Sequence, residues 1–105
     1  MTNPWRGEVS LVVDGVRHDM RLSLGALASL EAQLGVSSLV ELVQRFETTQ
    51  FSSVDVLRVI KAGLVGGGAA CDPQSVDHAE IEGGPMAAAR AAAELLARAF
   101  MVPGG

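Results

Sequence analysis

The sequence predicts an α+β fold that is mostly α, with an N-terminal β-hairpin followed by four or five short helices in a compact bundle. Three observations predict it. Two alternating segments flank an Asp-Gly pair, apolar residues then recur at helical spacing between capping signals, and the apolar residues are mostly Ala, Leu and Val. At 105 residues we expect a single domain, 1–105, with the hairpin at 8–22, the helical part at 23–101 and a tail at 102–105.

The hairpin is predicted around Asp14-Gly15, because both central residues of a type I′ turn need a positive φ and Asp-Gly supplies them readily. A two-residue turn fixes the register, which places one mostly apolar and one polar set of residues on opposite faces. The apolar face pairs Val13 with Val16, Leu11 with His18 and Val9 with Met20, and the polar face pairs Val12 with Arg17, Ser10 with Asp19 and Glu8 with Arg21.

Two helices are expected next. Ser23 is a good N-cap and Gly35 a good residue to end the first of them. The second begins with a capping box over residues 38–41. The residues expected to face the core are Leu24, Leu27, Leu30 and Leu34 in the first helix, and Leu39, Leu42, Val43 and Phe46 in the second.

A third helix follows from Ser52 to about Val65, with Asp55 well placed for the helix dipole. Its inward residues are expected to be Val54, Leu57, Ile60 and Leu64. Residues 66–68, all glycine, end this helix. We interpret them as a flexible joint, since a phosphate-binding loop needs its glycines to lead into a helix rather than out of one.

Two more helical segments are expected near the C-terminus. Asp72 and Pro73 can cap a short helix over 74–81, as N-cap and first helical residue. The last helix, from about Pro85 to Met101, is rich in Ala. It is expected to carry Arg90, Glu94 and Arg98 on a solvated face, opposite Met86, Ala89, Ala92, Ala93, Leu96 and Phe100.

The composition argues against several function classes. The net charge is −4 and Lys61 is the one lysine, whereas nucleic-acid-binding proteins carry a basic footprint. Cys71 is the one cysteine, so no intramolecular disulfide can form, which fits a reducing compartment. The longest apolar stretch, 87–101, is interrupted by charges, and residues 1–7 show no signal-peptide pattern. We therefore expect neither a membrane nor a nucleic-acid partner.

No arrangement of residues predicts catalysis, so we expect a binding or structural protein rather than an enzyme. Cys71 and His78 could form a nucleophile–base pair, but a small apolar residue at a helix entrance is the simpler interpretation. Asp77, His78, Glu80 and Glu82 offer metal-ligand types without a zinc or calcium spacing. His18 is expected to be a partly buried structural residue. No metal, cofactor or small-molecule substrate is predicted.

The remaining candidates are for protein interaction. Arg58 and Lys61 share one face of the third helix, either as a docking patch for an acidic partner or as ordinary solvated residues. Trp5 precedes the hairpin and could anchor a partner or fold back on the hairpin. On the Ala-rich last helix, which is either a core helix or a binding face, the candidate contact residues are Met86, Leu95, Leu96 and Phe100.

Several segments together resemble a known family. They are Gly7-Glu8, Asp14-Gly15, 22–27 with Leu30-Glu31, Phe51-Ser52 with 55–57, Ala62-Gly63-Leu64 before the glycines, and the Ala-rich closing helix. They resemble the small gene-transfer-agent proteins of alphaproteobacterial phage-like particles, a family grouped with phage tail assembly chaperones and also named for the tail tube. The resemblance covers about residues 7–100, and 71–82 contains no matching element.

The resemblance implies a cytoplasmic tail assembly chaperone of a gene transfer agent or prophage. Such a chaperone binds the tape-measure protein and the major tail tube protein while the tail grows, and it could itself form a homo-oligomer. The alternative is a structural tail component, in the tube or the tail tip, that stays in the particle. A third hypothesis is a regulatory DNA-binding protein, in which residues 38–65 form a helix-turn-helix, although Arg58 and Lys61 alone give that segment little positive charge.

Overall fold

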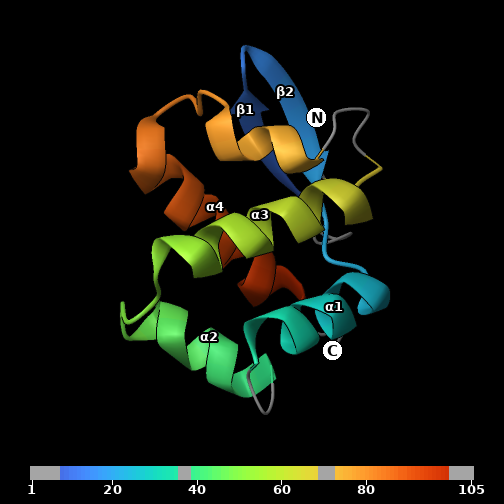
Figure 1. Ribbon diagram of the computed structural model, residues 1–105, viewed down its shortest axis with the longest axis vertical. Coiled ribbons are helices and arrows are strands. Elements are labelled where there is room, and N and C mark those ends of the chain that lie inside the picture. Colours follow the sequence, from blue (N-terminus) through green and yellow to red (C-terminus); the bar gives the residue numbers. More distant parts are fainter. Residues whose placement is uncertain (1–7, 36–38, 69–72, 100–105) are drawn as a thin grey trace.

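The computed structural model describes residues 8–35, 39–68 and 73–99 and confirms the predicted fold class. A two-stranded antiparallel sheet is followed by helices, and α3 crosses the middle of the molecule between the hairpin and the pair α1 and α2 (Figure 1). The elements in chain order are β1 (Val9–Val13), β2 (Val16–Met20), α1 (Leu24–Leu34), α2 (Leu39–Glu47), α3 (Ser53–Gly66), the 3₁₀ helix η2 (Pro73–His78) and α4 (Gly84–Ala99).

The hairpin has the predicted register throughout both strands. Asp14 and Gly15 both have positive φ, at 51° and 79°, as the turn requires. The buried side chains of the hairpin are Val9, Leu11, Val13 and Met20. The sheet continues briefly on the outer side of β1, where Ile81 forms an isolated bridge with Val13.

Helix α1 begins and ends where the sequence predicts. The Ser23 hydroxyl accepts a hydrogen bond from the backbone N–H of Ala26, and Gly35 adopts the left-handed conformation. The prediction that Leu24 faces the core is wrong, because its side chain is 84% exposed. Leu27 and Leu30 define the buried face, and Leu24, in the first turn, points about 90° away from the middle of that face.

Helices α2 and α3 are joined around a pair of stacked aromatic rings, Phe46 and Phe51, whose centroids are 4.7 Å apart. The predicted capping box of α2 involves Ser38, which lies outside the described residues. In α3, the prediction that Val54 faces the core is wrong, since 56% of it is exposed. Val59 is fully buried instead, because α3 contacts neighbours on several sides and has a wide buried face.

The segment predicted as a short helix over 74–81 forms η2 instead, ending at His78. Residue 72, its predicted N-cap, is outside the described residues. After η2 the chain reaches β1, where Glu82 donates a backbone hydrogen bond to the carbonyl oxygen of Val12 (3.1 Å), and then turns into α4. The helix ends before residue 81 because residues 80–82 are extended and form backbone hydrogen bonds with the edge of the sheet.

The core is built around α3, which packs against α1, β2, η2 and α4. Its C-terminal glycines are part of this packing, so the prediction of a flexible joint is wrong for Gly66 and Gly67. A Cβ atom on Gly67 would lie 2.2 Å from the carbonyl oxygen of Asp19. Within the described ranges, none of the helices combines the length and hydrophobicity needed to cross a membrane.

Candidate interaction surfaces

On α4, the residues predicted to bind partners differ in their exposure to solvent. Leu95 and Leu96 are buried in the protein's own core, at 0% and 1% exposure, so their assignment as contact residues is wrong. Their part of α4 faces α3 rather than solvent. Met86, in the first turn of α4, is 73% exposed and is available to a partner. Trp5 and Phe100 lie outside the described residues.

The predicted basic patch on α3 is largely engaged within the chain. Lys61 forms an ion pair with Asp77 of η2, and only 14% of the lysine side chain is exposed. The Lys61 ammonium donates a hydrogen bond to the Asp77 carboxylate and lowers the pKa of that group below its ordinary value. Arg58 is exposed and donates a hydrogen bond to the Gln33 side chain of α1 (3.3 Å). Lys61 therefore holds η2 against α3 and is not a free docking cation.

The residues considered for chemistry do not form a site in the part of the chain that the structure describes. Cys71 lies outside that part, so its distance to His78 is not defined. Among the described residues, no group of three or more His, Cys, Asp or Glu side chains could hold a metal ion. His18 is partly buried on β2, as the sequence predicts.

One open surface is an apolar groove between the start of α3, η2 and the start of α4. It encloses about 520 Å³. Half-buried side chains such as Val56, Leu57 and Ile81 line it, and the exposed Met86 stands at its side. The full lining is Phe51, Ser52, Ser53, Val56, Leu57, Ile60, Val76, Asp77, Ile81, Pro85, Met86, Ala88 and Ala89.

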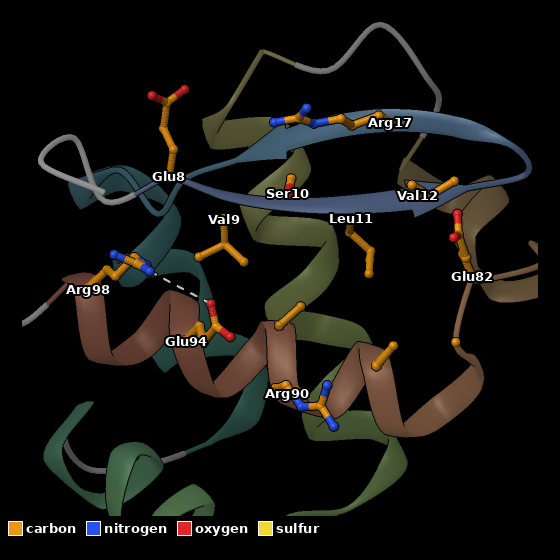
Figure 2. A pocket seen from close by; sticks show the side chains of 13 residues that line it. Glu8, Val9, Ser10, Leu11, Val12, Arg17, Glu82, Arg90, Glu94 and Arg98 are labelled. Atoms are coloured by element: carbon orange, nitrogen blue, oxygen red, sulfur yellow. Dashed lines mark ion pairs between the residues drawn. The ribbon is translucent and has the colours of Figure 1, made fainter. Parts of the chain in front are cut away.

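A second open surface, which we call the edge groove, lies between the outer edge of β1 and α4 and encloses about 550 Å³ (Figure 2). Val9 and Leu11 point from β1 toward α4, where Ala87 and Ala91 line the groove. Its remaining lining residues are Glu8, Ser10, Val12, Arg17, Glu82, Gly83, Arg90, Glu94 and Arg98.

The sequence does not predict the edge groove, although it predicts the strand and the helix that border it. The alternation of β1 predicts a strand but not which edge of it stays open, because that depends on where residues 80–82 return. The sequence predicts that Arg90, Glu94 and Arg98 lie on a solvated face. Glu94 and Arg98 form an ion pair at 3.8 Å, and all three residues also border the edge groove.

Comparison with known proteins gives one match. A family model described as phage tail tube protein, GTA-gp10, matches residues 6–102, which is nearly the whole chain. No curated protein and no solved structure matches the chain.

Proposed function

The chain belongs to the family described as phage tail tube protein, GTA-gp10, and on that premise we propose that it is a structural component of a phage-like tail. The particle would be a gene transfer agent or a related prophage. The match carries the proposal, because it extends over the hairpin and all the described helices and so concerns the whole domain.

The architecture supports a role in binding other tail proteins. Among the open surfaces of the described chain, one groove is apolar and another is bounded by a strand edge, and both kinds of surface are used to bind protein segments. The major tail protein is the first partner to expect for a tube component, and copies of this chain are the second. We also propose that the protein has no catalytic activity.

Quantitative mass spectrometry of purified particles tests the structural role. A tail component is expected at a fixed copy number relative to the major tail protein, and the number should survive washing in high salt. If particles with complete tails lack the chain, the structural role is refuted.

A second candidate function is that of a tail assembly chaperone, which acts in the bacterial cytoplasm and then leaves the tail. The apolar groove beside Met86 supports it, since a chaperone must expose apolar surface to hold an apolar segment of another chain. Its occupant would be a helical segment of the tape-measure protein. Co-expression tests this role: the tape-measure protein should become soluble with the wild type, and unchanged solubility would exclude it.

A further inference from the structure

Among the described residues, none pairs with the outer edge of β1 over the N-terminal half of the strand. In this hairpin Val13 pairs with Val16 beside the turn, so residues 9, 11 and 13 direct their backbone groups toward β2, and residues 10 and 12 direct theirs outward. The bond from the Glu82 N–H to the Val12 carbonyl confirms that direction. In the described part of the chain, nothing pairs with the outward N–H and C=O groups of Ser10.

An open strand edge is a template for another strand, and proteins usually cover or charge it. Here residues 80–82 cover the edge only near Val12 and Val13, and the chain then turns away at Gly83. A strand added beside Ser10 would continue that partial third strand along β1. It would occupy the edge groove, whose floor of Ala87 and Ala91 leaves space for inward side chains.

Arg98 indicates which kind of side chain the added strand should carry. Its Nε atom is enclosed and, among the described residues, has no hydrogen-bond partner, while its terminal nitrogen reaches Glu94 only at 3.8 Å. A guanidinium has five N–H donors, and the 28% exposed Arg98 side chain therefore keeps donors for a further carboxylate acceptor. Figure 2 shows Arg98 at the end of the edge groove and Glu8 pointing away from α4, so Glu8 does not supply that acceptor.

We propose that the edge groove binds an extended segment of another tail protein, which adds to β1 as a strand and places an Asp or Glu beside Arg98. The inference rests on the proposed function, because it takes the partner to be a tail protein. A second copy of this chain fits less well. Its own β1, Val9–Val13, contains no Asp or Glu that could be placed beside Arg98.

Overlapping ten-residue peptides that span the other tail proteins of the same particle test this proposal against the full-length chain. The key variant is Ser10→Pro, which removes the outward N–H without removing a bond to β2. Leu24→Pro is the matched control, because it places a proline at the first position of α1, far from the groove. Ser10→Ala keeps the N–H and separates the backbone contribution from that of the side chain.

Binding is expected for acid-bearing extended peptides, and Ser10→Pro should bind at least about tenfold more weakly than Ser10→Ala or Leu24→Pro. Arg98→Met should weaken the binding of the same peptides by a similar factor. If Ser10→Pro fails to fold, amide exchange in the wild type decides: the peptide should slow exchange at Ser10. The proposal is overturned if no peptide binds, if Ser10 exchange is unaffected, or if the wild type instead self-associates through Ser10.

The two proposals fail separately. A chain that is stoichiometric in purified tails but binds no peptide at Ser10 refutes only the edge-groove inference. A chain absent from the tails refutes the structural role even when a peptide protects Ser10.

Discussion

Gly66 lies so close to Arg21 that a Cβ atom on the glycine would be 2.0 Å from the arginine carbonyl oxygen. The last turn of α3 therefore packs directly against the backbone that leads from β2 into α1. A hydrogen bond from the Arg21 N–H to the carbonyl oxygen of Gly63, at 3.0 Å, secures the same junction. Both sides of the contact are backbone, which cannot give way as a flexible side chain can.

We expect Gly66→Ala to lower the free energy of unfolding by about 2 kcal/mol or more, because the new methyl group must displace one of two packed backbone segments. Urea denaturation followed by circular dichroism measures this change. Gly25→Ala is the matched control, since a Cβ atom on Gly25 meets nothing within 4 Å and the residue lies in α1. It should raise stability by about 0.5–1 kcal/mol. Equal effects of the two substitutions would contradict the packing argument.

The sequence predicts those features of the fold that depend on nearby residues. The hairpin register follows from Asp14-Gly15 and strand alternation, and the start of α1 follows from Ser23. Leu24 and Val54, which are wrongly predicted to face the core, are first-turn residues, and their exposure depends on which distant element covers the end of the helix. The glycines after Leu64 look like a loop in sequence, and only the position of β2 shows that they are a packing contact.

The candidate surfaces were harder to predict than the fold for the same reason. Met86 and Leu95 are both large apolar residues on one Ala-rich helix, and the sequence offers no means to tell an exposed residue from a buried one there. From the sequence alone, Lys61 is a candidate for a free cation. In the structure it forms an ion pair with Asp77 of η2, which lies far from it in the sequence. The open half of β1 depends on where a segment about seventy residues later returns, as the bond between Asp14 and Glu80 shows.

Asp55 is expected to contribute more to stability than an ordinary capping residue. It is buried, accepts the Ser52 N–H at 2.9 Å and lies 3.3 Å from the Arg45 guanidinium. Asp55→Ala should cost about 2–3 kcal/mol of unfolding free energy, because a capping bond and a partly buried charge pair are lost together. Ser52→Ala removes only the other half of the capping box and should cost about 1 kcal/mol. Denaturation showing the reverse order would refute this account.

The Lys61–Asp77 pair predicts a loss of stability in acid. Its hydrogen bond holds the folded-state pKa of Asp77 below the ordinary value, so the contribution is present above the unfolded-state pKa and is lost as pH falls through the folded-state pKa. Asp77→Asn should therefore lower the melting temperature at pH 7, and its difference from wild type should shrink below about pH 4. Calorimetric melting across this range is the measurement, and a constant difference would argue against the pair.

Truncation of Leu95 should lower the free energy of unfolding far more than truncation of Met86. Leu95 is fully buried and lies against Gly63 of α3, so Leu95→Ala is expected to cost about 2–5 kcal/mol. Met86→Ala should change stability by less than about 0.5 kcal/mol, because the side chain is mostly in solvent. If the apolar groove binds a tail protein, Met86→Glu should weaken that binding while the melting curve stays unchanged. A Met86→Glu protein that keeps both its melting curve and its affinity for the major tail and tape-measure proteins would exclude this groove as their binding surface.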